Sequence, residues 1–187
     1  MSEVVFFLEE ASARVLLESL LPRLGVNLDS VHFVVFEGKS DLEKQIERKL
    51  RGWLKPDTRF IILRDQDAGD CTAIKEGLVE KCRRAGRPAT LVRIACHELE
   101  SWYLGDLAAV EVALGIKHLS RHQVTVKYRQ PDRLSSPSLE LRQLTANRYQ
   151  KMGGSRAIGH HLSLSENGSH SYRVFVAGLR RLLALPA

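Results

Sequence analysis

The feature that most constrains the fold is a regular alternation of short apolar runs with amphipathic stretches over the first 115 residues. The apolar runs are rich in β-branched and aromatic residues and predict strands at 3–10, 31–38, 59–65 and 89–96. Apolar residues at helical spacing predict helices at 12–25, 40–54, 71–86 and 98–115. Such alternation indicates βαβ units and a mostly parallel sheet of about four strands with helices on both faces. We therefore predict an α/β, Rossmann-like core over residues 1–116.

Beyond residue 116 the alternation stops. Helical patterns return at 138–151 and 171–186, and the pair Gly153 and Gly154 between them predicts a flexible start to the segment 153–162. We expect residues 117–187 to form a basic, mainly helical appendage that packs on the core and is not an independent domain.

The net charge of +6 is unevenly distributed along the 187 residues. Residues 1–116 carry 16 Lys and Arg against 19 Asp and Glu, whereas residues 117–160 carry 9 against 2. An acidic region beside a basic surface suits a polyanion held near a metal ion. A basic surface that is simply solvated explains the same charges, so charge alone leaves both interpretations open.

The sequence predicts neither a membrane-spanning helix nor a secretory signal peptide. No apolar run approaches the roughly 18 residues needed to span a bilayer, and the N-terminal run lacks the basic region of a signal peptide. The three cysteines, Cys71, Cys82 and Cys96, show no zinc-type spacing, and their odd number argues against a disulfide framework. We expect a cytoplasmic protein with no membrane partner.

Acidic residues lie at the end of three of the four predicted strands or shortly after them. In chain order they are Glu9, Glu10, Asp65, Asp67, Asp70, Glu98 and Glu100. Parallel strands bring their carboxyl ends to one edge of the sheet, where ligand sites form in open α/β sheets. Crowded carboxylates repel one another unless a cation compensates them, and their oxygens suit Mg²⁺ or Mn²⁺. The sequence therefore predicts a divalent metal site at this edge.

The spacing of Asp65 and Asp67 has a local rationale. In an extended chain, residues two positions apart point the same way, so both carboxylates can face one cation. Two alternatives stay open for the neighbouring acids. Asp70 is equally suited to cap the helix that begins at Cys71. The acids of the segment 98–100 suit a first helical turn, where the helix dipole favours negative charge.

The stretches FFLEEASA and FIILRDQDAGD resemble the Toprim domain. That domain is shared by topoisomerases, bacterial primases, small ribonucleases and the nucleases of overcoming-lysogenization-defect proteins. Its signature is a glutamate at the end of the first strand and a D-x-D at the end of the third. The resemblance places Glu9 at the glutamate, and Asp65 and Asp67 at the D-x-D positions.

A second resemblance covers nearly the whole chain. It rests on the segments FLEEASAR, GKSDLEKQI, RDQDAGDC, ELESWYLGD, YQKMGGSRAIG and YRVFVAGLRRL. Together they resemble a family of small, largely uncharacterised bacterial Toprim-like proteins. Its members are often encoded beside ABC-type ATPases and are suspected of a role in defence against phage.

The sequence departs from the Toprim pattern after the first strand. Many Toprim domains have glycine after the glutamate, and this chain has Glu10, which leaves open whether Glu9 or Glu10 is the working residue. Residues 9 and 10 face opposite sides if the strand persists, so only one is expected to point into the site, and the motif position favours Glu9. No tyrosine lies in a recognisable topoisomerase context, and primase-type elements are missing.

The resemblance implies a nuclease that uses Mg²⁺ or Mn²⁺ to hydrolyse DNA or RNA. Asp65 and Asp67 would hold the ion, and Glu9, with Glu98 or Glu100, would complete its shell or bind a second ion. The ion would activate a water, and Glu9 would move the proton.

Two cations beside the glycine pair are candidates for the substrate phosphate. Lys151 and Arg156 would bind it or stabilise charge in the transition state. An ABC-type or AAA ATPase is the implied partner. The alternatives are a non-catalytic Toprim-like subunit that binds nucleic acid or regulates such a complex, and another α/β phosphotransfer enzyme that uses the D-x-D acids.

Overall fold

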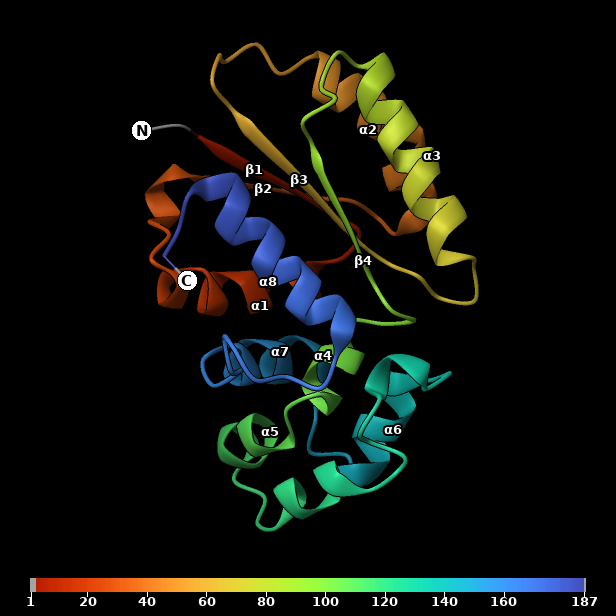
Figure 1. The fold of residues 1–187 in the computed structure, drawn as a ribbon, viewed down its shortest axis with the longest axis vertical. Helices are drawn as coiled ribbons and strands as arrows, with labels where there is room; N and C mark the ends of the chain where they lie inside the picture. The colour runs from red at the N-terminus through yellow and green to blue at the C-terminus, as the bar shows by residue number, and fades with distance from the viewer. Residues whose placement is uncertain (1–2, 187) are drawn as a thin grey trace.

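Four parallel strands form the centre of the molecule, in the order β2-β1-β3-β4 (Figure 1). The structure is a computed structural model that describes residues 3–186. The strands are β1 (Val4–Leu8), β2 (Val31–Val35), β3 (Arg59–Asp65) and β4 (Leu91–Ala95). β1 pairs with both β2 and β3, and Leu8 lies opposite Leu63. The predicted α/β class is confirmed, and the register brings the carboxyl ends of β1 and β3 side by side.

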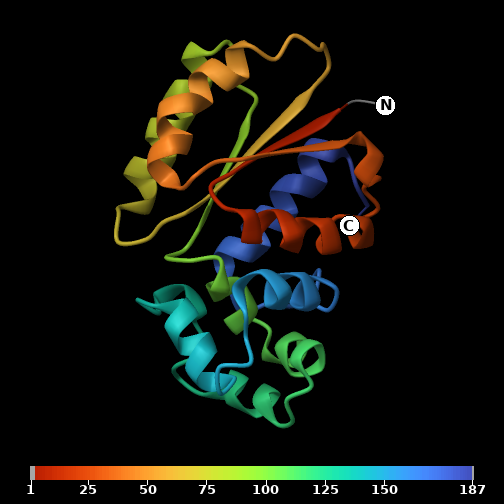
Figure 2. The same ribbon diagram turned by 180° about the vertical axis from the view of Figure 1, so that it is seen from behind.

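Helices cover both faces of this sheet. The α-helices are α1 (Ala11–Leu20), α2 (Lys39–Arg51), α3 (Cys71–Arg84), α4 (Glu100–Leu104), α5 (Leu107–Leu114), α6 (Pro137–Leu144), α7 (Lys151–Gly159) and α8 (His170–Leu183). Short 3₁₀ helices are η1 (Pro22–Leu24), η2 (Leu28–Ser30), η3 (Leu119–Val124) and η4 (Pro131–Arg133). α2 and α3 lie on one face, and α1 and α8 lie on the other (Figures 1 and 2). Along residues 3–186, every helix is too short or too polar to cross a lipid bilayer.

The side chains of β1 alternate between the two faces. Val5 and Phe7 join the apolar cluster beneath α2 and α3, whereas Phe6 and Leu8 join the cluster beneath α1 and α8. Every residue of β1 is buried. Coverage of both faces therefore explains why the strands are nearly continuous apolar runs in the sequence.

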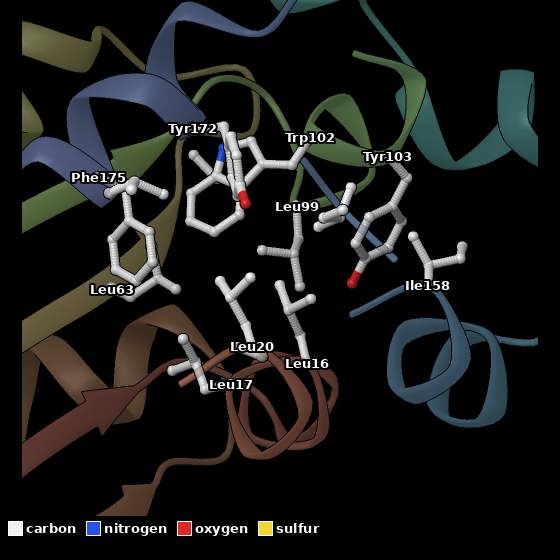
Figure 3. Close-up of a cluster of buried hydrophobic side chains, with 14 of the residues drawn as sticks. Leu16, Leu17, Leu20, Leu63, Leu99, Trp102, Tyr103, Ile158, Tyr172 and Phe175 are labelled. Atoms are coloured by element: carbon white, nitrogen blue, oxygen red, sulfur yellow. The ribbon is translucent and has the colours of Figure 1, made fainter. Parts of the chain in front are cut away.

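The larger of the two clusters contains residues from both sides of position 116. Leu16 and Leu20 of α1 face Trp102 of α4 and Phe175 of α8, and Ile158 of α7 lies beside them (Figure 3). The rings of Trp102 and Phe175 have their centroids 4.8 Å apart. Helices beyond residue 116 thus complete the core, and the division into 1–116 and 117–187 stays a prediction.

One predicted helix is divided. The pattern over 98–115 forms two helices, α4 and α5, that separate at Gly105 and Asp106. Asp106 ends the continuity because its side chain accepts a hydrogen bond from the backbone N–H of Ala109, at 3.1 Å, and so caps α5. The single helix predicted over this range is therefore wrong.

The glycine pair does not begin a flexible segment. Gly153 and Gly154 both lie inside α7, which packs along α1. A Cβ atom at Gly154 would lie 2.4 Å from a ring carbon of Tyr149, so the missing side chain lets this ring pack against the helix. Gly154 thus allows close packing. From composition alone, such a glycine cannot be distinguished from one that makes a segment flexible.

Candidate functional site

The acids that follow β1 and β3 meet at the carboxyl edge of the sheet. β3 ends at Asp65, and Glu9 directly follows β1. The backbone N–H of Glu9 donates to the carbonyl of Leu63 at 3.3 Å, and Glu9 Oε2 accepts a hydrogen bond from the backbone N–H of Asp65 at 3.0 Å. The parallel register thus brings together two acids that are 56 positions apart in the chain.

Four carboxyl groups act on one another here, and we call Glu9, Glu10, Asp65 and Glu100 the acid cluster. Burial raises the pKa of Asp65 well above its ordinary value, and the charges of Glu10, Glu100 and Glu9 raise it further. Burial also raises the pKa of Glu9, although the N–H of Asp65 favours its charged form. A cluster that disfavours its own negative charge is suited to gain a proton or a cation.

Lys151 supplies part of the missing positive charge. Its Nζ lies 2.5 Å from Oε2 of Glu10, and this ion pair joins α7 to the beginning of α1. Burial lowers the pKa of the Lys151 ammonium, but its bond to Glu10 and the charges of Glu100 and Asp65 outweigh burial, so that its pKa is raised. Lys151 is therefore placed among the acids, as a counter-ion.

Both glutamates after β1 reach the cluster. β1 ends at Leu8, and Glu10 is the N-cap residue of α1, so strand alternation does not extend over Glu9 and Glu10. Glu9 contacts the backbone of Asp65, and the charge of Glu10 raises the pKa of the same aspartate. The expectation that only one of the two faces the site required the strand to persist to residue 10, and this condition is not met, because β1 ends at Leu8.

Asp67 lies at the outer side of the cluster. Its backbone is left-handed, with φ of 54°, so the alternation expected for an extended D-x-D does not reach it. Its Oδ2 lies 2.8 Å from Nζ of Lys39, and its side chain is 36% exposed, compared with 14% for Glu9. The charge of Asp67 still contributes to the raised pKa of Glu9. Asp67 is thus near the cluster, but it faces solvent and a lysine.

Gln66 and His97 fix the loop that carries Asp67. The backbone N–H of Gln66 donates to the carbonyl of Ala95 at 2.9 Å, and its side-chain oxygen accepts from the N–H of His97 at 3.2 Å. The N–H of Asp67 donates to the carbonyl of His97 at 2.7 Å, and His97 Nδ1 lies 3.0 Å from the carbonyl of Asp67. These contacts bind the loop after β3 to the loop after β4.

The two acids after β4 have different surroundings. Glu100 is only 2% exposed, and Tyr149 Oη donates to its Oε1 at 2.9 Å. Burial raises the pKa of Glu100, while the charge of Lys151 opposes this shift. Glu98 Oε2 accepts a hydrogen bond from the backbone N–H of Ser138, at 2.7 Å, near the beginning of α6. Glu100 therefore belongs to the cluster, whereas Glu98 binds the first turn of α6.

Asp70 and Arg156 have other surroundings. Asp70 caps α3, because its Oδ1 accepts a hydrogen bond from the backbone N–H of Ala73 at 2.7 Å. Arg156 is exposed on α7, and its guanidinium has no hydrogen-bond or ion-pair partner within residues 3–186. The structure thus gives Asp70 the capping role that the sequence left open.

Three groups at this edge are missing from the sequence prediction. Lys39 binds Asp67, and Arg64, which is 5% exposed, places its Nε 3.9 Å from Oε2 of Glu9. Burial raises the pKa of Tyr103, as do the charges of Glu100, Glu10 and Asp65, and its hydroxyl has no hydrogen-bond partner in the described part of the chain. The sequence does contain a signal for Arg64, because this arginine follows four apolar residues within a predicted strand. Tyr103 lies on an apolar helical stripe and gives none.

The chemistry of the donors suits a hard cation, although the present side-chain positions do not assemble a ligand shell. The cluster consists of carboxyls, and the pKa values of Glu9, Asp65 and Glu100 are all raised. Within residues 3–186, no three His, Cys, Asp or Glu side chains are arranged to hold a metal ion. Lys39 and Lys151 already bind carboxylates here, so an entering divalent ion would have to compete with ammonium groups.

The fold and the site define an α/β, Rossmann-like protein with an acid cluster at the carboxyl edge of its parallel sheet. Residues 8–180 match the family model described as "Domain of unknown function (DUF4276)". The chain belongs to this family, and the match includes the whole acid cluster and Lys151. The comparison with curated proteins and the comparison with solved structures found no match.

Proposed function

We propose that the protein is a metal-dependent nuclease that hydrolyses phosphodiester bonds in DNA or RNA. The observation that carries the proposal is the contact between Glu9 and Asp65 at the ends of neighbouring parallel strands. Such strand ends are where open α/β sheets bind ligands. The resemblance of FFLEEASA and FIILRDQDAGD to the Toprim signature supports the same assignment.

Each acid has a definite part in the proposal. Glu9 and Asp65 hold Mg²⁺ or Mn²⁺, and Glu10, Glu100 and the outer Asp67 are available to complete the shell. A divalent ion bound there polarises the scissile phosphate and lowers the pKa of an attacking water. Glu9 would accept the proton of that water, because it contacts Asp65 and its carboxylate remains partly exposed. The proposal leaves out Glu98, which binds the first turn of α6, and Asp70, which caps α3, because the charge of neither is a leading cause of the raised pKa values of Glu9, Asp65 and Glu100.

The lysines have two successive roles. Without a divalent ion, Lys151 and Lys39 neutralise Glu10 and Asp67. If a divalent ion took their place on these carboxylates, their ammonium groups would be free to bind the substrate phosphate or to stabilise the charge that develops on it. Arg156, exposed on the same helix as Lys151, is a further candidate phosphate contact.

The test is cleavage of labelled single- and double-stranded DNA and RNA by the full chain. We expect cleavage with Mg²⁺ or Mn²⁺, none with EDTA, and a loss of at least about 100-fold in Asp65→Asn. Asp57→Asn is the matched control, because Asp57 is an exposed loop residue with positive φ that asparagine tolerates. Cleavage that persists in both Asp65→Asn and Glu9→Gln would overturn the proposal.

A second candidate is a non-catalytic subunit that binds nucleic acid or regulates a larger complex. The ion pairs of Lys39 with Asp67 and of Lys151 with Glu10 favour it, because they satisfy two of the carboxylates without a metal. Binding would then persist without cleavage under any divalent ion, and the acids could be replaced with little loss. The Toprim-like resemblance is the support for an ABC-type ATPase partner and for a role in phage defence, in either case.

A further inference from the structure

Residues 117–134, which we call the basic arm, lie at the end of the molecule away from α2 and α3 (Figure 1). The arm carries Lys117, Arg121, Lys127, Arg129 and Arg133. Its single acid, Asp132, is used internally. Asp132 Oδ1 accepts a hydrogen bond from Ser169 Oγ at 2.6 Å, and its Oδ2 accepts from the backbone N–H of Ser171 at 2.8 Å. The outward charge of the arm is therefore positive.

A cavity of about 350 Å³ opens on the basic arm. Its lining residues are Val126, Lys127, Arg129, Gln130, Arg133 and Leu134. Lys127 pairs with Glu140 at 2.7 Å, and Arg129 donates to the carbonyl of Val124 at 3.2 Å. The guanidinium of Arg133 has no hydrogen-bond or ion-pair partner in the described chain. The cavity thus presents three cationic side chains, and of these only Lys127 is paired with an acid.

The size and the lining indicate a class of ligand. A volume of about 350 Å³ lies at the small end of the range of roughly 300–1,000 Å³ for ligand pockets. Guanidinium groups bind phosphate through two parallel hydrogen bonds, and an apolar wall from Val126 and Leu134 accommodates a sugar or base. We infer that this cavity binds one nucleotide unit of a nucleic-acid strand through its phosphate ester.

The arm is attached to α4, the helix that carries Glu100 of the acid cluster. Gln123 Nε2 donates to the carbonyl of Leu104 at 3.1 Å, and its Oε1 accepts from the N–H of Leu107 at 2.8 Å. η4 packs on α4, the helix that begins at Glu100. A strand bound in the cavity is thereby held next to α4, the helix that contributes Glu100 to the cluster. That the cavity guides this strand to the acids as a substrate rests on the proposed function. That the cavity binds the strand does not.

The experiment measures fluorescence anisotropy of a labelled 20-nucleotide single strand, as DNA and as RNA, in EDTA so that no cleavage occurs. The variant is Arg129→Gln with Arg133→Gln. The matched control is Arg51→Gln with Arg83→Gln, which removes the same charge from exposed arginines of α2 and α3. We expect the arm variant to bind at least about 10-fold more weakly. The slope of log K against log salt concentration should become shallower by about 0.7, because the cavity holds the phosphate of one nucleotide. The control should change affinity less than about 2-fold.

Equal weakening in the two double variants overturns the inference, because affinity would then follow net charge alone. Unfolding curves of the arm variant and the wild type should coincide. Inorganic triphosphate and a free mononucleotide serve as competitors. Displacement of the strand by either competitor, at the same concentration of phosphate groups, would assign the cavity to small free phosphate anions and overturn the strand-binding part. Binding that survives in wild type and Asp65→Asn, without cleavage under Mg²⁺ or Mn²⁺, sinks the proposed nuclease and leaves this inference standing.

Discussion

Glu3 and Glu9 lie at opposite ends of β1, and their carboxyl groups have opposite electrostatic surroundings. Glu3, which is 7% exposed, accepts hydrogen bonds from Trp53 Nε1 at 3.1 Å and from Lys55 Nζ at 3.0 Å. Glu9, which is 14% exposed, accepts one hydrogen bond from the N–H of Asp65. One glutamate is surrounded by donors, and the other is surrounded mainly by acids.

The pKa values follow this contrast. Burial by itself raises the pKa of Glu3, but the hydrogen bonds from Lys55 and Trp53 outweigh it and lower the pKa below the ordinary value. Burial raises the pKa of Glu9, and the charge of Asp67 adds to this shift. The carboxylate at the amino end of β1 is thus fully compensated, whereas Lys39, Arg64 and Lys151 compensate the acids at the carboxyl end only in part. The lack of compensation lies where an open α/β sheet is expected to bind a ligand.

The largest expected effect separates the two glutamates by activity. Glu9→Gln should lower the rate of cleavage by about 100- to 10,000-fold, the range for loss of a general acid or base. Glu3→Gln should leave the rate per folded molecule within a few-fold, because Glu3 lies at the other end of the strand. Single-turnover cleavage with Mn²⁺ measures both. Equal losses in the two variants would remove the functional meaning of the contrast.

The next effect concerns the helix that brings Lys151 to the carboxyl end. Gly154→Ala should lower the free energy of unfolding by about 1–3 kcal/mol, because the added Cβ would overlap the ring of the buried Tyr149. Gly153→Ala is the matched control. Apart from its chain neighbours and the backbone of its own helix, no described atom lies within 4 Å of the new Cβ, so this variant should raise the free energy of unfolding by about 0.5–1 kcal/mol. Chemical denaturation gives both values, and equal changes would contradict the packing role.

The smallest effect is a difference in pH dependence, measured by denaturation in EDTA. An ordinary glutamate has a pKa of 4.5. Because the pKa of Glu9 is raised on folding, its ionisation lowers the free energy of unfolding of the wild type as pH rises from this value through the raised pKa. The stability of Glu9→Gln relative to the wild type should therefore increase as pH rises. Glu3 contributes stability above its ordinary pKa that is lost as pH falls through its lowered pKa, so Glu3→Gln should lose relative stability as pH rises. Slopes of the same sign between about pH 3 and 7 would refute the contrast.

Local sequence signals were sufficient to predict the parallel sheet and the approach of two of its acids. Apolar runs located the strands, and parallel connection then implied that Glu9 and Asp65 converge. The pairing of Lys151 with Glu10 joins residues 141 positions apart, and no periodicity encodes it. The left-handed turn at Asp67 depends on hydrogen bonds from a neighbouring loop. What escaped prediction is therefore the tertiary surroundings of each acid, which decide its pKa and its partner.

The position of α8 has a consequence for how the chain reaches its native state. α8 packs on β4, and Arg93 Nε donates to the carbonyl of Val174, a residue 81 positions later. Contacts so distant in sequence delay folding, since a long loop must close before they form. During synthesis, this face of β4 and the ring of Trp102 therefore stay uncovered until α8 has left the ribosome. We expect the nascent protein to depend on chaperones at this stage, because its exposed apolar surface favours aggregation.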